Sequence, residues 1–216
     1  MKLLLTSTGL TNQKIRDFFI SQFNTFEGKK ACLIFTVRQE SDWQWLEHYD
    51  NELKAIGLQY DGINISEEKD LSDLQEYDVY YVCGGNTFYI LDRLRKTNLD
   101  KIILKAIEDE KFYLGVSAGS IIAGPDIEVA GIGDGDENDI NLSDLSGFGL
   151  APFHISPHYT EQDKISIEEF YNKKNEAVIA LTDEQALFVT DKETILVGNK
   201  GFTDLSGELS VVDKTE

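Results

Sequence analysis

The segment from residue 113 to residue 124, Y-L-G-V-S-A-G-S-I-I-A-G, constrains the fold of this chain more than any other. It opens with a short apolar run, turns through Gly115, Ser117 and Gly119, and leaves in a second apolar run. This G-x-S-x-G pattern is typical of a strand that turns sharply into a helix, with the serine at the tip of the turn. Small residues on both sides let the backbone fold tightly and let another molecule approach the serine. We therefore predict a strand over residues 112–116, a tight turn at Ser117 and a helix after it.

The rest of the chain alternates short apolar runs with segments of helical periodicity. Apolar runs at residues 2–8, 31–37, 60–65 and 77–83 predict strands, and residues 10–26, 42–56, 87–95 and 99–109 predict helices. Strands that are apolar on both faces and alternate with helices indicate a mostly parallel sheet covered by helices on both sides. Residues 177–181, 186–189, 194–197 and 209–212 predict short strands that extend this sheet in antiparallel fashion. With 216 residues, one α/β domain over residues 1–216 is expected.

The charge and the cysteines limit the environment and the partners. The formal net charge is −19, which argues against binding to nucleic acid or to an anionic membrane surface, because phosphates would be repelled. Cys32 and Cys83 both lie in apolar runs and predict buried free thiols of a reducing compartment. The apolar run at residues 3–5 is too short for a signal peptide or a membrane span, so a soluble cytoplasmic protein is expected. The oligomeric state stays open, with a homodimer as one option.

A serine nucleophile needs a general base, and the chain has three histidines. His48 lies within a predicted helix and is interpreted as a surface residue. His154 lies inside an apolar run and is interpreted as a hydrogen-bonded, half-buried imidazole. His158 follows Pro157 at the exit of that run, where a rigid turn could aim its ring at Ser117, and is the favoured base. A zinc pair is disfavoured because Pro157 prevents a regular helix from carrying both His154 and His158, and no metal or cofactor is predicted.

A third group should orient the imidazole, and an acidic loop at residues 131–141 offers candidates. Asp134 is favoured and Asp136 comes next, while Glu137 and Asp139 remain alternatives. The loop lacks the D-x-D-x-D-G spacing of a calcium site, so calcium is disfavoured.

A second glycine-rich turn, at residues 84–86, follows the strand predicted at residues 77–83. Its plain interpretation is a loop between a strand and a helix. Its functional interpretation is a second backbone N–H donor for an oxyanion, because glycine lets the chain approach a reacting carbonyl. The N–H of Ala118, at the start of the helix after Ser117, is the first such donor. Phosphate binding is disfavoured because the turn has neither G-x-G-x-x-G nor G-K-[ST].

Three segments together resemble the peptidase E/cyanophycinase family of serine peptidases: C-G-G-N-T-F at residues 83–88, G-V-S-A-G-S at 115–120 and S-P-H-Y at 156–159. The resemblance extends from the first strand to the C-terminal strands. It implies a flavodoxin-like, three-layer sheet similar to that of class I glutamine amidotransferases, with serine in place of their cysteine. It further implies Ser117 as nucleophile, His158 as base, an acid in the loop after the serine, and oxyanion donors at Gly85 and Ala118. A short peptide is the implied substrate.

The best-known member of the family cleaves dipeptides after an N-terminal aspartate, and it has arginines soon after its histidine. This chain has T-E-Q-D-K-I-S-I-E-E-F at residues 160–170, where Lys164 is the only cation. We expect Asn86 and Lys164 to bind substrate, although lysine does not clamp a carboxylate in bidentate fashion. Two rival interpretations stay open: an α/β-hydrolase esterase, which shares G-x-S-x-G but usually carries an H-G-G-G motif absent here, and a non-catalytic binding module.

Overall fold

The computed structural model of the chain describes residues 1–216 except 68, 72–73, 200–202, 205–210 and 214–216. In the described part, the larger sheet contains eight strands. Their spatial order is β11 (Val211–Asp213), β9 (Thr194–Gly198), β8 (Gln185–Thr190), β1 (Lys2–Thr6), β5 (Phe112–Val116), β4 (Val79–Val82), β2 (Lys30–Phe35) and β3 (Gln59–Asn64). Strands β1, β5, β4, β2 and β3 are parallel, whereas β8 runs antiparallel to both β1 and β9. The predicted α/β fold with an antiparallel C-terminal extension is therefore confirmed.

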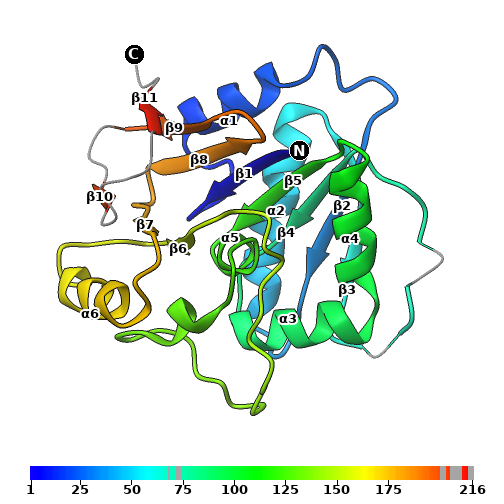
Figure 1. The fold of residues 1–216 in the computed structure, drawn as a ribbon. Helices are drawn as coiled ribbons and strands as arrows, with labels where there is room; N and C mark the ends of the chain where they lie inside the picture. The colour runs from blue at the N-terminus through cyan, green and yellow to red at the C-terminus, as the bar shows by residue number, and fades with distance from the viewer. Residues whose placement is uncertain (68, 72–73, 200–202, 205–210, 214–216) are drawn as a thin grey trace.

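Helices cover both faces of this sheet (Figure 1). They are α1 (Gln13–Ser21), α2 (Asp42–Ile56), α3 (Thr87–Lys96), α4 (Leu99–Glu108), α5 (Ala118–Ile122), the 3₁₀ turn η1 (Glu128–Gly131) and α6 (Lys164–Lys174). Because side chains alternate along a strand, Leu4 of β1 packs on the side of α1 and α2, while Leu3 and Leu5 pack on the side of α3, α4 and α5. All three leucines are fully buried. The molecule thus has the predicted three layers.

A second, smaller sheet departs from the prediction. It contains β10 (Thr203–Asp204), β7 (Val178–Ala180) and β6 (His154–Ser156), in that order. The prediction that residues 177–181 extend the main sheet is wrong, because β7 pairs in parallel with β6 after the crossover helix α6. Such a helical crossover favours parallel neighbours. Of the strand predicted at residues 209–212, residues 209–210 lie outside the described part, and β11 begins at Val211.

The carboxyl ends of the central strands meet at one edge of the main sheet. Ser117 follows β5, Gly84 follows β4 and Thr36 follows β2, and loops at this edge are where parallel α/β sheets gather ligand sites. Cys32 and Cys83 are buried and free, as predicted. Within the described residues, no helix combines the length and apolar character needed to span a bilayer.

Candidate active site

The turn at Ser117 has the strained backbone that the G-x-S-x-G pattern predicts. Ser117 has φ 50° and ψ −109°, and its N–H donates to the Thr6 carbonyl at 2.9 Å. Two neighbours hold the turn against β1 and β4. The Ser120 hydroxyl accepts the Thr6 N–H at 2.8 Å. A Cβ at Gly119 would lie 2.2 Å from the Val82 carbonyl oxygen, so only glycine lets α5 approach β4 this closely. The serine side chain is thereby presented at the sheet edge.

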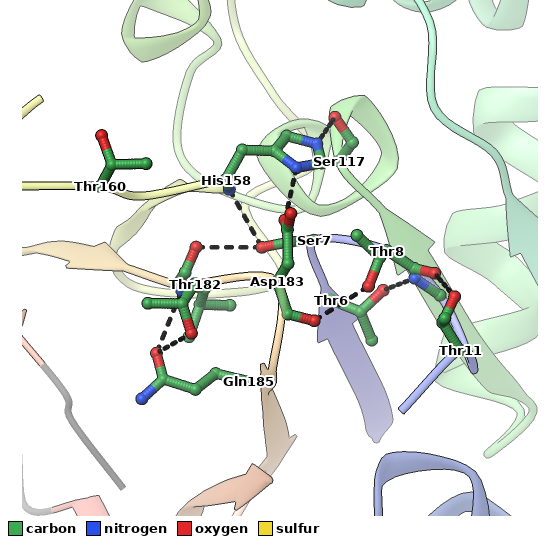
Figure 2. A network of polar contacts seen from close by, with 12 residues as sticks. Thr6, Ser7, Thr8, Thr11, Ser117, His158, Thr160, Thr182, Asp183 and Gln185 are labelled. Carbon is green, nitrogen blue, oxygen red and sulfur yellow. Dashed lines mark hydrogen bonds and ion pairs between the residues drawn. The ribbon is translucent and has the colours of Figure 1, made fainter. Parts of the chain in front are cut away.

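His158 lies beside this serine, two residues beyond the end of β6. Its Nε2 is 3.1 Å from Ser117 Oγ (Figure 2). The His158 backbone has φ 58°, and its N–H donates to the buried Ser7 hydroxyl at 3.1 Å. The Ser7 hydroxyl in turn donates to the Leu181 carbonyl at 3.0 Å, which ties the histidine turn to the end of β7. The structure therefore brings together the serine and the histidine that the sequence pairs.

Asp183 completes a chain of hydrogen bonds behind the imidazole. Its Oδ1 lies 2.7 Å from His158 Nδ1 (Figure 2). Because β6 and β7 are parallel neighbours, the residues that follow their carboxyl ends lie side by side, which places Asp183 next to His158. The carboxylate favours the tautomer with the proton on Nδ1, which leaves the Nε2 lone pair facing the serine hydroxyl.

The structure places Asp183, and not the predicted Asp134, beside the His158 imidazole. Asp134 is exposed, and its carboxylate makes no hydrogen bond or ion pair within the described part of the chain. The acidic loop at residues 131–141 packs instead against the turn before α3. There the Asp136 carboxylate accepts hydrogen bonds from Thr87, and Asp139 pairs with Arg38. The signal that the sequence interpretation missed is an aspartate three residues after the end of β7, in L-T-D-E-Q at residues 181–185.

The segment that contains Asp183 is held in place by hydrogen bonds of its backbone and of its side chains. The Thr8 hydroxyl donates to the Asp183 carbonyl at 3.0 Å. On the C-terminal side, the Gln185 side-chain oxygen accepts the Thr182 N–H at 3.0 Å. These contacts connect the loop after β1, the end of β7 and the start of β8 in one polar network (Figure 2). The Asp183 side chain itself is more than half exposed, so the network fixes a carboxylate that still meets solvent.

A cavity of about 1140 Å³ opens at this edge of the sheet. Its lining includes all three members of the hydrogen-bond chain, Ser117, His158 and Asp183. The lining also includes residues that the sequence interpretation did not select for the site: Phe35, Arg38, Asp42, Trp45, His48 and Tyr49. Its volume slightly exceeds the range of about 300–1,000 Å³ that is usual for small-molecule sites, which is enough for a short peptide.

His48 is partly exposed, as its interpretation as a surface residue requires, but it also lines the cavity, which the sequence did not indicate. Its Nε2 lies 3.2 Å from the buried Glu52 carboxylate and 3.1 Å from the Thr11 hydroxyl. His154 is fully buried rather than half-buried, and its Nε2 lies 2.7 Å from Glu176. Neither histidine contacts Ser117.

The remaining predicted residues divide between the cavity and the surface. Gly85 lines the cavity and has φ 139°, a conformation that suits glycine. Ala118 opens α5 directly after the serine. Asn86 also lines the cavity, but its Oδ1 accepts the Tyr89 N–H and its Nδ2 donates to the Glu137 carbonyl, so its amide caps α3 rather than facing a substrate. Lys164 opens α6, is exposed and is not among the residues that line the cavity, so the structure does not place it beside Ser117 as the substrate-binding prediction expects.

Cys83 also lines the cavity and could be mistaken for a nucleophile. Burial raises the pKa of its thiol well above the ordinary range, and the nearby Glu52 carboxylate adds to this effect. A thiol of this kind stays protonated and is a poor nucleophile.

A potential metal site occurs elsewhere in the described residues. Asp126, His154 and Glu176 place potential ligand atoms within 4.8 Å of one another. The Lys174 ammonium group already pairs with Asp126 at 2.7 Å, however, which supplies a cation to this cluster. None of the three residues lines the cavity at Ser117.

A serine at a strained strand–helix turn, within hydrogen-bond distance of a histidine that a carboxylate orients, defines a site of the serine-hydrolase type. The profile of peptidase family S51 matches residues 3–197, and the chain belongs to that family. It is a peptidase, a hydrolase that acts on peptide bonds.

Known proteins of this family resemble the chain over most of its length. It is 30% identical to an uncharacterized peptidase of Listeria monocytogenes over 181 residues, which are 80% of this chain and 87% of the relative. It is 29% identical to peptidase E of a Nostoc species over 205 residues, 87% of this chain and 78% of that protein. The crystal structure of a peptidase E-like protein from Listeria monocytogenes superposes with a TM-score of 0.76 at 27% identity and covers 92% of this chain and 98% of its own.

Proposed function

We propose that the chain is a serine exopeptidase that hydrolyses short peptides through Ser117, His158 and Asp183. The observation that carries this proposal is the continuous hydrogen-bond chain from Ser117 Oγ through His158 to Asp183, at 3.1 and 2.7 Å, at the edge of a large cavity. Membership of a peptidase family supports it. In this proposal Asp183 takes the place of Asp134 as the third member.

Each of the three residues has a defined step. His158 Nε2 removes the proton from Ser117 Oγ as that oxygen attacks the carbonyl carbon of the scissile bond. Asp183 accepts the hydrogen bond from Nδ1 and stabilises the imidazolium that forms. The imidazolium then protonates the departing amine, and a water molecule hydrolyses the acyl-enzyme by the same proton transfers in the second half of the reaction.

The oxyanion of each tetrahedral intermediate would be bound by backbone N–H groups. Ala118 follows the nucleophile at the start of α5, and Gly85 lies in the facing turn after β4. Gly84 lies between them: a Cβ at this residue would be 3.4 Å from the Ser117 Cβ, so the two turns are in close contact. Preorganised donors of this kind stabilise the transition state because they need no reorientation during the reaction.

The charges around the cavity support short substrates with a free amino terminus. Asp42, Asp183 and Glu184 line the cavity in a chain of formal net charge −19. Such a field attracts a free α-ammonium group. The specific dependence on N-terminal aspartate would require a cation, and Arg38 is the one lysine or arginine among the described residues that line the cavity. Its guanidinium also pairs with Asp139 and lies over the Tyr89 ring.

The experiment that tests the activity combines labelling with a substrate panel. A serine-reactive phosphonate should label Ser117 in the wild type and not in Ser117→Ala, and the labelled peptide identifies the residue. Asp-X, Glu-X and neutral dipeptides should be hydrolysed, whereas simple esters without an amino group should be poor substrates. Hydrolysis of esters without hydrolysis of any dipeptide would refute the exopeptidase proposal.

The role of Arg38 needs its own substitution. Arg38→Met should lower kcat/KM for Asp-X relative to Ala-X by about 5- to 150-fold, because a contact between charged groups contributes roughly 1–3 kcal/mol. Lys164→Met, which changes an exposed lysine outside the cavity, is the matched control. An unchanged Asp-X to Ala-X ratio in Arg38→Met would remove Arg38 from substrate recognition.

A further inference from the structure

The acidic loop at residues 131–141 has no role in the proposed catalytic steps. Part of it nevertheless forms hydrogen bonds with the turn that contains Gly85. The Asp136 carboxylate accepts two hydrogen bonds from Thr87, one from the backbone N–H at 2.7 Å and one from the hydroxyl at 2.6 Å. Both bonds end on the same carboxylate oxygen, Oδ2. One residue further on, the Glu137 carbonyl accepts the Asn86 side-chain N–H at 2.9 Å. Three hydrogen bonds therefore run from residues 136–137 to residues 86–87, next to Gly85.

The acidic loop is itself held in place, so it can act as a fixed support. The Asp136 N–H donates to the Ala130 carbonyl at 2.7 Å, and the Gly135 N–H donates to the Ile132 carbonyl at 3.0 Å. A Cβ at Gly135 would lie 2.2 Å from the Ala130 carbonyl oxygen, so the turn before Asp136 is closed tightly. The partner of Asp136 in these hydrogen bonds, Thr87, is fully buried at the start of α3. A buried residue with two short hydrogen bonds to a fixed carboxylate has little freedom to shift.

The turn itself needs such a support. Gly85 has φ 139°, which its own sequence does not enforce because glycine is free to adopt many backbone conformations. The side chain of Asn86 is committed to capping α3 through Tyr89. The direction of the Gly85 N–H therefore depends on what fixes the next two residues. In the described structure these are held by α3, whose Ile90 N–H donates to the Asn86 carbonyl at 2.9 Å, and by the contact with residues 136–137.

We infer that Asp136 is a positioning residue that acts through Thr87 to hold the Gly85 N–H in place for the oxyanion. This inference rests on the proposed function, since it assumes that Gly85 donates to the transition state. Asp136 is not among the residues that line the cavity, so it acts through Thr87 and does not contact the substrate. Because only one carboxylate oxygen accepts both bonds, an asparagine side chain can replace it and an alanine cannot.

The test compares Asp136→Ala with Asp136→Asn and with Asp134→Ala, the last a change of an exposed aspartate in the same loop. Asp136→Ala should lower kcat per phosphonate-titrated active site by about 10- to 100-fold, below the roughly 100- to 1000-fold reported for complete loss of an oxyanion donor. Its KM should change little, because a ground-state carbonyl depends less on this donor. Asp136→Asn should recover most of kcat, and Asp134→Ala should match the wild type. A peptide aldehyde, whose hemiacetal carries the oxyanion, should bind Asp136→Ala more weakly in proportion to kcat/KM.

Hydrogen exchange provides a readout that does not depend on peptide hydrolysis. Amides of residues 85–88 should exchange faster in Asp136→Ala than in the wild type, Asp136→Asn or Asp134→Ala. Unchanged exchange in Asp136→Ala would overturn the inference, and so would an unchanged kcat per titrated site. The proposed function can fail separately. If the wild type neither reacts with phosphonate nor cleaves peptides, the proposed function is wrong. Faster exchange in Asp136→Ala would then still show that Asp136 holds the turn at residues 85–88.

Discussion

Ser117 holds a backbone conformation that L-residues rarely adopt, with φ 50° and ψ −109°. Strain of this kind costs on the order of 1–3 kcal/mol and persists only where the surroundings determine it. Here the surroundings are β1 and β4, through the hydrogen bond from the Ser117 N–H to Thr6 and the close approach of Gly119 to Val82. The glycines of the motif therefore act on the serine through packing.

Gly119→Ala should be strongly destabilising. The added methyl would lie 2.2 Å from the Val82 carbonyl oxygen, and backbone cannot move aside cheaply. We expect a loss of at least about 1–3 kcal/mol in the free energy of unfolding, the usual range for overpacking, measured by urea denaturation. Gly131→Ala is the control, because its methyl would meet only ordinary contacts at 3.6 and 3.7 Å. Equal stability of the two variants would contradict this account of the turn.

Substitution of Asp183 and substitution of Asp134 should have opposite effects on turnover. Asp183→Asn keeps the shape of the side chain, but the amide no longer favours the His158 tautomer with its proton on Nδ1. Turnover should therefore fall by about 10⁴-fold, as for the equivalent change in a serine-protease triad. Asp134→Asn should leave turnover unchanged, since its carboxylate makes no hydrogen bond to His158 or to any other described residue. Turnover of a dipeptide, with thermal unfolding as a check of folding, decides between them. Loss of activity in Asp134→Asn with retention in Asp183→Asn would restore the acidic loop as the source of the acid.

At this scale, the sequence predicted Ser117 and His158 because each lies in a local motif, G-x-S-x-G and S-P-H-Y. Asp183 could not be predicted in the same way. Its position depends on the pairing of β6 with β7, which is a contact between segments more than 20 residues apart in the chain. Arg38 and His48 were missed for a related reason, because the cavity wall that they share is assembled from β2, α2 and the neighbouring loops.

Among the elements, β6 and β7 have three residues each and show how little of strand pairing a short sequence specifies. Three residues are too few for a clear alternation of apolar and polar side chains, so the sequence predicts extended segments but not their partners. The crossover through α6 decides the pairing, and the register aligns His154 with Val178. The longer strands β1, β2, β4 and β5, which alternate with helices, were predicted together with their parallel arrangement.

Helix α2 carries a buried carboxylate toward the cavity. Glu52 is 7% exposed, and its Oε2 accepts a hydrogen bond from the Tyr81 hydroxyl at 2.6 Å. The Thr11 hydroxyl and His48 lie near its other oxygen. Burial raises the pKa of Glu52 above the ordinary value, and the hydrogen bonds and the nearby His48 oppose this only in part. Glu52 therefore links α2, β4 and the loop after β1 at a cost that depends on pH.

Glu52→Gln should change how stability depends on pH. A carboxyl whose pKa is raised by folding binds protons more tightly in the folded state, so wild-type stability falls as pH rises above the unfolded pKa of about 4.3. Glutamine does not titrate. The stability of the variant relative to the wild type should therefore increase with pH from about 4.3, by at most about 1.4 kcal/mol per pH unit, until the folded pKa is passed.

Urea unfolding at several pH values between about 4.5 and 7.5 measures this relative stability. Glu47→Gln is the matched control, because Glu47 is exposed on the same helix. A constant difference between Glu52→Gln and the wild type across this range would show that burial of Glu52 does not shift its titration.

For the whole molecule, the two faces of the main sheet are predictable and the second sheet is not. Alternating strand and helix patterns indicate three layers, and the buried residues of β1 confirm which side chains face which layer. The charge is a property of the same scale. The chain has a formal net charge of −19, and Arg38 is the one lysine or arginine among the described residues that line the cavity. The summed field therefore acts on a substrate before any single contact forms.

Ionic strength should reveal this field when substrate charge is varied. A dipeptide amide with a free α-ammonium group carries one positive charge at neutral pH and should be attracted, so its kcat/KM should fall as salt is raised from about 0.01 to 0.15 M, where the screening length shortens from roughly 30 to 8 Å. The N-acetylated dipeptide amide has no charge and should show both lower kcat/KM and little salt dependence. Initial rates at several salt concentrations, normalised to titrated active sites, provide the comparison. Equal cleavage of free and acetylated substrates, with the same dependence on salt, would mean that the acidic surface has no part in selecting a free amino terminus.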